Sequence, residues 1–482
     1  MFRPQSWLPA LLGTDERYRL ANAVFLRVLA LIYLAAFVST ALEIQGLVGE
    51  QGILPAGEYL DRLFGDIGPL AWIRFPTLFW IEHGDTTLLW TCYVGCGFAL
   101  TLLIGWRPRL SLVVLFLLYL SLYRVGQIFF NFQWEFLLLE AGFIAIFTVS
   151  GPTRLTVLLF HWLLFRLRFL SGLSKLLSGD PSWAGLTTLN HYFETQPLPH
   201  VGSWYAHLLP DWLLVTGTGA TLLVELVVPF FIFLPRPFRI LAAVLTIGFQ
   251  LLIIATSNHN FINLLTIALC LYLLDDQALQ RILPWRPSIG GSRQPLATLI
   301  ALPLAAALIV PTSLYTAWEF VADRPPATWR HPANWVRAWG LGNVFHIFPT
   351  MQTERQELTI QGSSDGVEWK RYRFRYKPNS PGDVPRFIVP LHPRLDWMIW
   401  FVPSQNPAMR PWFERFLWRL SQNSPTVTSL LAENPFADKA PRYLRVLVHR
   451  YRFTGAVERR QTGDVWRAEY LGEFPRVPPR IP

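Results

Sequence analysis

Lysine, cysteine and charge of either sign are scarce in this chain. Only four of its 42 basic residues are lysine, and Lys175 is the single lysine before position 370. Charged residues amount to 15% of the chain and hydrophobic residues to 52%, and the hydrophobic residues are gathered in long blocks. Such blocks exclude an ordinary soluble domain and indicate a membrane protein.

The scarcities also exclude several functions. Cys92 and Cys96 share a helix face and Cys270 stands alone, with no turn or helix start that would lower a thiol pKa, so we expect packing residues rather than a thiol-exchange site. No metal-ligand spacing is visible, and no metal site is expected. The net charge of +10 comes largely from loop arginines and an Arg-rich C-terminal part, without any nucleic-acid-binding motif.

Nine apolar segments approach the length of about 20 residues that a membrane-spanning helix needs. The fourth and eighth are short, so eight spans would also agree with the sequence. We expect a bundle of eight or nine transmembrane helices over residues 20–318, after a cytoplasmic segment 1–19, with long extracytoplasmic loops at 42–87 and 178–211. The nine segments are 20–41, 88–104, 109–130, 136–150, 155–177, 212–234, 238–257, 260–275 and 297–318.

The orientation follows from arginines in the short loops, because cytoplasmic loops carry the excess of basic residues. A cytoplasmic N-terminus leaves only Arg62 and Arg74 in the outer loops between helices. Nine spans then place the C-terminal part outside. The inner segments carry Arg3, Arg17, Arg19, Arg107, Arg109, Arg154, Arg236, Arg239, Arg281, Arg286 and Arg293.

Residues 319–475 lack the long apolar blocks of the preceding part. Their pattern predicts an extracytoplasmic α+β domain rich in strands. The segment 355–377 predicts two strands joined at Asp365-Gly366, and 442–453 and 464–474 alternate in the same way. The segment 411–422 predicts a helix that starts at Pro411. The Pro-rich tail 476–482 is not expected to fold.

Two features of this domain leave alternatives open. Asp396 is expected to shape a turn or to accept hydrogen bonds from Arg394 or from backbone N–H groups, rather than to catalyse a reaction. The Trp-rich segment 397–418 could lie against the membrane surface or pack in the core of the domain.

Ionisable residues inside the apolar segments predict buried ion pairs, because a lone charge in a bilayer is costly. Depths estimated at about 1.5 Å per residue place Glu140 level with Arg168, and Glu225 level with Arg166. We therefore predict the pairs Glu140–Arg168 and Glu225–Arg166.

Polar residues gather in the turns that follow the third, fifth and seventh segments. Since these turns lie on the same side of the membrane, we expect them to enclose one wet cavity beside Lys175. His191 and His259 lack a carboxylate at readable spacing, so they could equally be hydrogen-bonded loop residues. The predicted lining is Arg124, Gln127, Asn131, Gln133, Glu135, Lys175, His191, Tyr192, Glu194, Gln196, Asn258, His259, Asn260 and Asn263.

Several long runs closely resemble the lipase maturation factor family over residues 120–475. These runs are NFQWEFLLLEAGFIAIF, SGLSKLLSGDPSWAGLTTLNHYFETQPLP, ATSNHNFINLLTIALCLYLLDD, HPRLDWMIWF and ENPF. The resemblance implies a multi-pass membrane protein, resident in the endoplasmic reticulum of animals, that helps secreted dimeric lipases to reach an active fold. The preference for Arg over Lys indicates a GC-rich bacterial genome, and hence an inner membrane.

A more distant resemblance concerns Lys175. SGLSKL is similar to a segment of the vitamin K-dependent γ-carboxylase superfamily, in which a lysine acts as base; that resemblance implies a membrane enzyme with a quinone or lipid cofactor. Lysine can become a neutral amine when it is buried, whereas arginine cannot. The chain lacks the supporting histidine in NFQWE. Lys175 could instead anchor a helix end at the lipid headgroups or bind a ligand in the cavity.

A transporter is a third class, which the absence of an inverted repeat in the sequence argues against. The membrane lipid and a secreted client such as a lipase are the expected partners, and the oligomeric state stays open.

Overall fold

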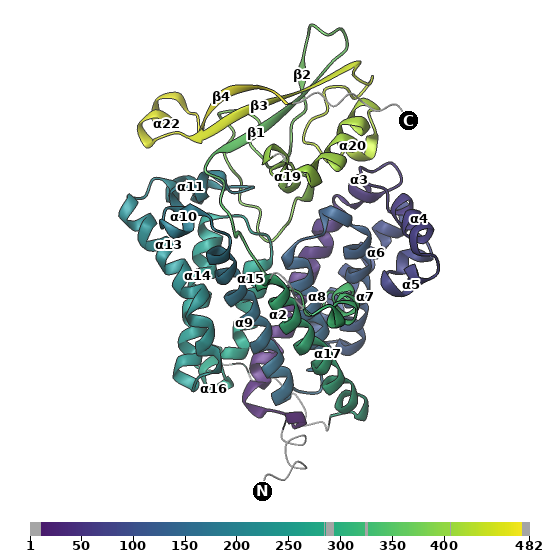
Figure 1. Ribbon diagram of the computed structural model, residues 1–482, viewed down its shortest axis with the longest axis vertical. Helices are drawn as coiled ribbons and strands as arrows, with labels where there is room; N and C mark the ends of the chain where they lie inside the picture. Colours follow the sequence, from purple (N-terminus) through teal and green to yellow (C-terminus); the bar gives the residue numbers. More distant parts are fainter. Residues whose placement is uncertain (1–10, 284, 286–293, 323–325, 405, 475–482) are drawn as a thin grey trace.

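The computed structural model of the chain describes residues 11–283, 285, 294–322, 326–404 and 406–474. It consists of a helical bundle with a smaller sheet-bearing domain stacked on one end, which we call the sheet end of the bundle (Figure 1). The arginines at positions 3, 286 and 293 and the Pro-rich tail 476–482 lie outside the described residues.

Within the described ranges, seven helices are long and apolar enough to cross a membrane. The remaining two of the nine expected segments are also helical, but short: α8 (Gln133–Ile146) and α15 (Ile262–Cys270), which continues as η6 (Leu271–Leu273). Both are mostly buried by their neighbours. The prediction of a membrane helical bundle is confirmed. The seven long helices are α2 (Arg19–Ala41), α6 (Asp85–Ile104), α7 (Pro108–Val125), α9 (Arg154–Leu177), α13 (Asp211–Leu226) with η5 (Val228–Phe233), α14 (Arg236–Thr256) and α17 (Leu296–Val321).

Shorter helices fill the loops of the bundle. In the loop 42–87 they are α3 (Ile44–Val48), α4 (Ala56–Ile67) and α5 (Leu70–Arg74), and in the loop 178–211 they are α10 (Pro181–Ala184), α11 (Thr188–Thr195) and α12 (Val201–His207). The other two are α16 (Asp276–Leu279) and α18 (Arg330–Ala338).

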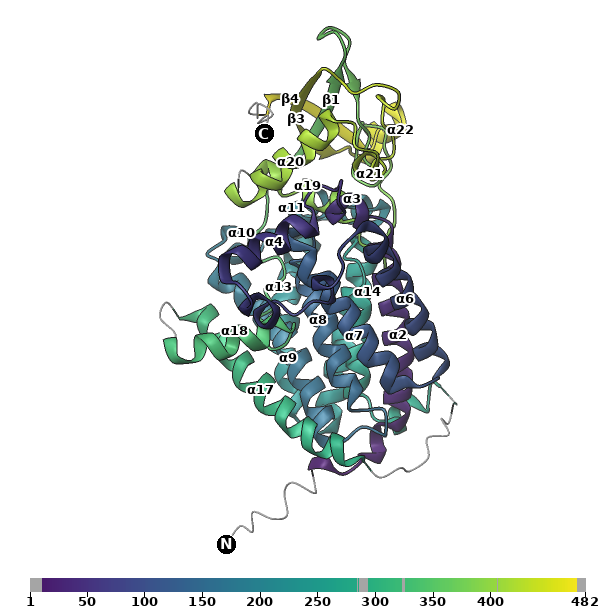
Figure 2. The same ribbon diagram turned by 90° about the vertical axis from the view of Figure 1, so that its right-hand side faces the viewer.

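The turns of the bundle gather at its two ends as expected. At the end far from the sheet, the N–H of Asp15 donates to the carbonyl of Pro152 over 2.7 Å, and Nη2 of Arg236 donates to Asp275 over 2.9 Å. The backbone N–H groups of Leu20 and Ala21 both donate to Asp276. The loops 42–87 and 178–211 lie at the sheet end (Figures 1 and 2).

The sheet has four antiparallel strands in the order β2-β1-β3-β4. Its strands are β1 (Arg355–Ser363), β2 (Lys370–Arg371), β3 (Tyr443–Phe453) and β4 (Trp466–Glu473). Four helices accompany them, α19 (Arg394–Ile399), α20 (Arg410–Ser421), α21 (Pro425–Thr428) and α22 (Ala456–Thr462). The α+β class and the predicted strands and helix are confirmed.

One detail of this domain corrects an expectation from the sequence, and a second decides between two alternatives. The second strand of the hairpin is much shorter than residues up to 377 would give, because the N–H groups of Tyr376 and Lys377 donate to the side chain of Asp396 instead of to a strand. Trp397 and Trp412 are 3% and 1% exposed. These two residues of the Trp-rich segment therefore pack in the core and not on the membrane surface.

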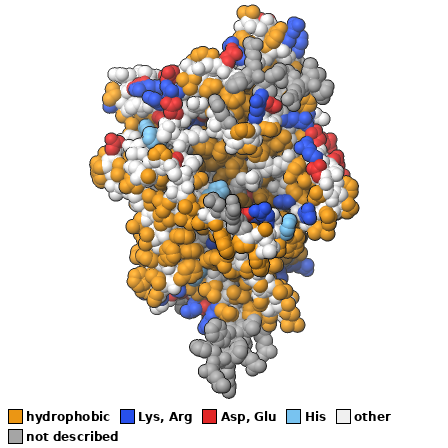
Figure 3. Space-filling view, viewed as in Figure 1, with side chains coloured by type: hydrophobic (Ala, Val, Ile, Leu, Met, Phe, Trp, Pro, Cys, Tyr) orange, Lys and Arg blue, Asp and Glu red, His pale blue; other side chains and the backbone are white. Residues whose placement is uncertain are grey.

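The outer surface of the bundle is hydrophobic. Figure 3 shows hydrophobic side chains over the helices, while charged side chains gather on the sheet-bearing domain and at the lower end. On α14, Val244 and Leu252 are 58% and 67% exposed. A surface of this kind is stable in contact with lipid rather than with water.

Candidate functional site

The two predicted ion pairs form with exchanged partners. Arg166 pairs with Glu140, and Nη2 of Arg168 lies 3.1 Å from Oε1 of Glu225; all four side chains are buried. The prediction relied on depth alone and was wrong about the partners. Residues two positions apart in a helix are rotated by about 200° around its axis, so Arg166 and Arg168 face opposite sides of α9. One side meets α8, which carries Glu140, and the other meets α13, which carries Glu225.

The Glu140–Arg166 pair binds the main chain that leads into the sheet-bearing domain. Oε2 of Glu140 accepts a hydrogen bond of 2.8 Å from the N–H of Gly342, and Nη1 of Arg166 donates to the carbonyl of Asn343 over 3.0 Å. Gly342 has a φ of 67°, and a Cβ there would lie 2.8 Å from Thr312. A glycine is therefore required where this segment passes between α17 and the ion pair.

Lys175 is buried, with 4% of its surface exposed, and does not extend to the outer surface of the protein. Its Nζ lies 2.7 Å from Oε2 of Glu225, 2.8 Å from the carbonyl of Ile347 and 3.1 Å from the carbonyl of Ser171. Two of these contacts are hydrogen bonds, to the carbonyls of Ile347 and Ser171, and the contact with Glu225 is an ion pair, so three acceptor oxygens surround an ammonium group that has three N–H bonds. Lys175 thus joins α9 to α13 and to the segment that follows Gly342.

Glu135 forms a third buried pair, on the other flank of the bundle. Its Oε1 lies 2.5 Å from Nη1 of Arg394, and neither side chain is exposed. Tyr119 also hydrogen-bonds to Glu135. The N–H of Arg394 donates to Oε2 of Glu43 over 2.6 Å, and its guanidinium lies over the ring of Phe130 at 3.5 Å. Arg394 of the sheet-bearing domain therefore occupies a socket in the bundle.

Further residues of the predicted lining hold the sheet-bearing domain in the same way. Gln133 accepts from the N–H of His346, and Asn258 bonds both the carbonyl of Arg386 and the N–H of Ile388. Glu194 accepts from the N–H of Phe453 over 2.5 Å. These side chains bind the main chain of the sheet-bearing domain and do not line a cavity.

The remaining predicted residues also lie away from a cavity. Arg124 and Gln127 donate to the carbonyls of Arg74 and Leu54 and so support the loop 42–87. Three others have local roles or lie at the surface: Gln196 donates to Ser203 and Thr256, Asn260 accepts from the N–H of Ile262, and Asn131 is exposed. His191 is partly exposed in α11.

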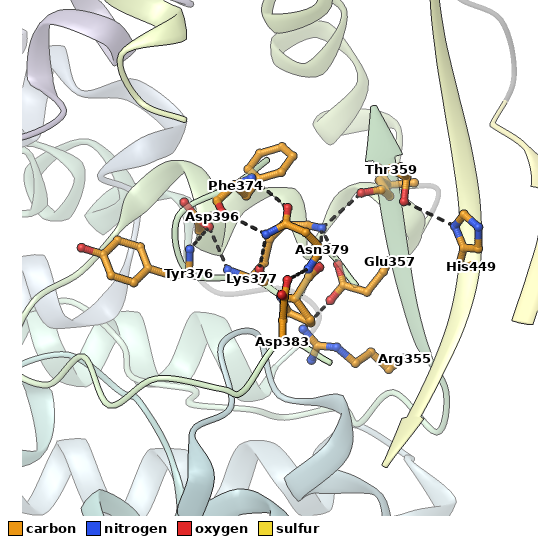
Figure 4. Close-up of polar contacts among 12 residues, drawn as sticks. Arg355, Glu357, Thr359, Phe374, Tyr376, Lys377, Asn379, Asp383, Asp396 and His449 are labelled. Carbon is orange, nitrogen blue, oxygen red and sulfur yellow. Dashed lines mark hydrogen bonds and ion pairs between the residues drawn. The ribbon is translucent and has the colours of Figure 1, made fainter. Parts of the chain in front are cut away.

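The sheet-bearing domain contains a buried charge cluster at its contact with the bundle (Figure 4). Glu357 of β1 lies between Arg355, at 2.5 Å, and Lys377, at 2.8 Å. Burial alone would raise the pKa of Glu357, but the charges and hydrogen bonds of Lys377 and Arg355 hold it below its ordinary value. Arg355 in turn donates to the carbonyls of residues 194, 196 and 197 in the loop 178–211.

Asp396 belongs to the same region and has a structural role. Its Oδ1 accepts from the N–H groups of Tyr376 and Lys377 over 2.8 and 2.9 Å, as Figure 4 shows. The expectation that Asp396 binds backbone N–H groups is confirmed. Burial raises its pKa, although these hydrogen bonds oppose the rise.

A cavity of about 430 Å³ lies between α9, α11, α13, α14 and α15. Four predicted residues line it: Lys175, Tyr192, His259 and Asn263. The Tyr192 hydroxyl lies 2.5 Å from Nε2 of His259 and 3.0 Å from Oγ of Ser257. Burial, reinforced by the positive charges of His200 and Lys175, lowers the pKa of His259 to about 3, so its imidazole is neutral near pH 7.

The cavity also contains polar residues that the sequence analysis missed. Arg168 and Glu225, which had been assigned only to ion pairs, line it, and so does Gln250 of α14. Gln250 is the single polar side chain between Thr246 and Thr256 in an otherwise apolar helix. That isolation was the available signal.

The fold and the buried polar contacts define a class of protein. It is a multi-pass membrane protein whose transmembrane helices hold its C-terminal α+β domain. Residues 20–281 match the lipase maturation factor transmembrane domain, and residues 341–476 match the lipase maturation factor C-terminal domain. The chain belongs to the lipase maturation factor family.

Relatives match over nearly the whole chain. Lipase maturation factor 2 of Xenopus laevis is 32% identical, with 95% of this chain and 82% of that protein covered. Lipase maturation factor 1 of Mus musculus is 33% identical over 97% of this chain and 88% of that protein. Lipase maturation factor 2 of Homo sapiens is 30% identical over 95% and 82%. No solved structure matches the chain.

Proposed function

We propose that this protein assists the folding or assembly of secreted, lipase-like clients. The observation that carries the proposal is the match of both parts of the chain, bundle and sheet-bearing domain, to proteins named lipase maturation factors. In this account the bundle is the scaffold and the sheet-bearing domain meets the client.

The membrane placement is part of the proposal. The arginines of the short loops favour a cytoplasmic N-terminus and an extracytoplasmic sheet-bearing domain. That side is where a secreted client folds. The high ratio of Arg to Lys favours the inner membrane of a bacterium, and a eukaryotic source would place the protein in the endoplasmic reticulum.

Strand β4 is the surface that we propose for the client. Among the described residues β4 pairs within the sheet only with β3, so the outer edge of its middle part, residues 467–471, has no neighbouring strand. Tyr470 and Leu471 of this strand are 56% and 40% exposed. An extended client segment can add to such an edge as a further strand, with the exposed side chains contributing apolar contacts.

The geometry of Lys175 favours the scaffold over the enzyme. A general base must offer a lone pair, whereas the three acceptors around Nζ match an ammonium group with three N–H bonds. The ion pair with Glu225 stabilises the charged form further. Lys175 accordingly acts by holding the segment at Ile347 in place.

Co-expression with a secreted dimeric lipase tests the proposed function. In cells that lack their own maturation factor, the chain should raise lipase activity per unit of secreted lipase several-fold. An unchanged specific activity, with the chain folded in the membrane, would refute the function.

The client surface has its own variants. The double variant Tyr470→Asp and Leu471→Asp should lose most of the increase, because it replaces the two exposed apolar side chains of the strand with charges and so removes the apolar contacts. The matched control Val367→Asp, at an 82% exposed position in the β1–β2 turn, should retain it. Equal activity of the two variants would remove β4 as the client surface and leave the proposed function standing.

A further inference from the structure

The cavity beside Lys175 carries polar atoms that no protein atom satisfies. Oε2 of Glu225 accepts no hydrogen bond, although it lies 2.7 Å from Nζ of Lys175. Among the described residues of the lining, Nε2 of Gln250, Oδ1 of Asn263 and Nε of Arg168 also have no hydrogen-bond partner. The three side chains are 2%, 2% and 4% exposed, and all three line the cavity. Buried polar atoms of this kind cost about 1–3 kcal/mol each unless a ligand or water satisfies them.

The amide pair fixes the kind of group that is missing. Nδ2 of Asn263 donates to Oε1 of Gln250 over 2.8 Å, which leaves the NH2 group of Gln250, a donor, and the amide oxygen of Asn263, an acceptor, without partners. Exchanging N and O in both amides leaves the same set, a donor and an acceptor, so the conclusion does not depend on their orientation. A hydroxyl group, which both donates and accepts, fits this pair.

The charge of the lining calls for an anion. Arg168 and Lys175 share the single carboxylate of Glu225, and the nearby His259 is neutral, so the ionisable groups of the cavity sum to one positive charge. Lys175 is held by two carbonyls and by the ion pair with Glu225, whereas Nε of Arg168 has no hydrogen-bond partner. An excess buried cation is costly in a membrane and is offset by a bound anion.

The walls of the cavity are apolar and open toward the outside of the bundle. Leu209, Leu213 and Leu252 line the cavity and are 41%, 37% and 67% exposed. They lie near or on α13 and α14, which stand side by side at the edge of the bundle in Figure 1, where Figure 3 shows a hydrophobic surface. The cavity therefore opens toward the hydrophobic outer surface of the bundle.

We propose that the cavity binds the head of an anionic glycerophospholipid that carries a free hydroxyl group, of the phosphatidylglycerol type. The phosphate lies against Arg168, a glycerol hydroxyl bonds the Gln250–Asn263 pair, and the acyl chains leave between α13 and α14. The volume of about 430 Å³ holds the head and the first part of the chains. This site is independent of the client surface on β4.

Competition between lipids tests the site in the unmodified protein. The full chain is placed in nanodiscs that contain phosphatidylglycerol, phosphatidylmethanol and phosphatidylethanolamine, and the retained lipid is identified by native mass spectrometry. Phosphatidylmethanol has the same charge without the hydroxyls, so we expect roughly fivefold weaker retention than for phosphatidylglycerol. Phosphatidylethanolamine, which is zwitterionic, should be retained at least about tenfold more weakly. Equal retention of the three lipids, or of none, would overturn the proposal.

Variants locate the site. Gln250→Leu and Asn263→Leu should each abolish the preference for phosphatidylglycerol over phosphatidylmethanol. Asn22→Leu is the control, because Asn22 is equally buried but has its partners in Thr148 and Tyr272. The preference should survive in that variant, and its loss there, or its persistence in the other two, would contradict the assignment. Displacement of the lipid by millimolar glycerol phosphate would instead indicate a site for the soluble head alone and would also overturn it.

Discussion

The bundle has two flanks that treat a buried carboxylate differently. On the flank formed by α2, α7 and α8, which we call the sealed flank, Arg394 covers Glu135. On the flank formed by α9, α13 and α14, which we call the cavity flank, Glu225 borders an open cavity. Both flanks bury a carboxylate inside an apolar bundle. The first uses it to hold the sheet-bearing domain, and the second combines it with two cations and leaves unpartnered amides beside it. Buried polar groups in one bundle can therefore serve as attachment in one place and as a binding site in another.

The sealed flank should be the more sensitive of the two. Arg394→Met leaves Glu135 as an uncompensated buried charge, which costs about 3–5 kcal/mol of the free energy of unfolding. The unfolding midpoint in detergent measures this loss. Adding Glu135→Leu removes the lone charge, so the double variant should recover much of the stability. If Arg394→Met were as stable as the parent, the socket would not hold the domain.

On the cavity flank, Lys175→Met should cost less, about 2–3 kcal/mol, because Arg168 stays to compensate Glu225. The substitution also frees the carbonyl of Ile347, so hydrogen exchange should rise in residues 342–351. Exchange in residues 388–395, which dock on the other flank, should not change. A uniform rise in both segments would argue against separate attachments.

The two flanks should also respond to pH with opposite signs. The lowered pKa of His259, about 3, means that the unfolded chain takes up a proton below about pH 6.5 while the folded chain does not. Stability from this group is present above pH 6.5 and is lost as the pH falls toward 3, by about 2 kcal/mol between pH 6.5 and 5. His259→Gln should flatten that acid limb in a series of unfolding midpoints. An unchanged limb would mean that His259 is not buried as a neutral ring.

Glu43, on the sealed flank, makes the free energy of unfolding depend on pH in the opposite direction. Burial raises its pKa to about 8, against the hydrogen bond from the N–H of Arg394. Its contribution to stability is complete below about pH 4.5 and is lost as the pH rises through 8. Glu43→Gln should therefore reduce the loss of stability between pH 5 and 8, and the difference between this variant and the parent isolates the group.

The smallest effect is expected at Asn131. This residue was predicted to line a cavity but is exposed. Asn131→Ala should change the free energy of unfolding by less than about 0.5 kcal/mol and should not alter lipid retention. A large effect would revive the wider cavity.

Hydropathy was sufficient to locate the helices, and alternation of side chains located three of the four strands. Both signals are local, since an apolar block or an alternating run depends only on neighbouring residues. The length of the remaining strand, β2, was overestimated. Its end is set by Asp396, which lies about 20 residues further along the chain.

The partners of the buried charges could not be predicted from the sequence. Estimated depth did not distinguish Arg166 from Arg168, which lie two residues apart, because the direction of each side chain around α9 decides which carboxylate it meets. The acceptors and donors that fill the predicted cavity are backbone groups of residues such as Gly342 and His346. Every residue has such groups, so no residue type in the segment 340–395 signals that it docks.

Hydrogen exchange of the parent protein in nanodiscs tests most directly whether the bundle holds its own C-terminal segment. The amides of Gly342, His346, Met351, His392 and Arg394 each donate to a bundle side chain or to the loop that follows α9. The account predicts that they exchange as slowly as amides within the helices. Exchange at the rate of an open loop would contradict it.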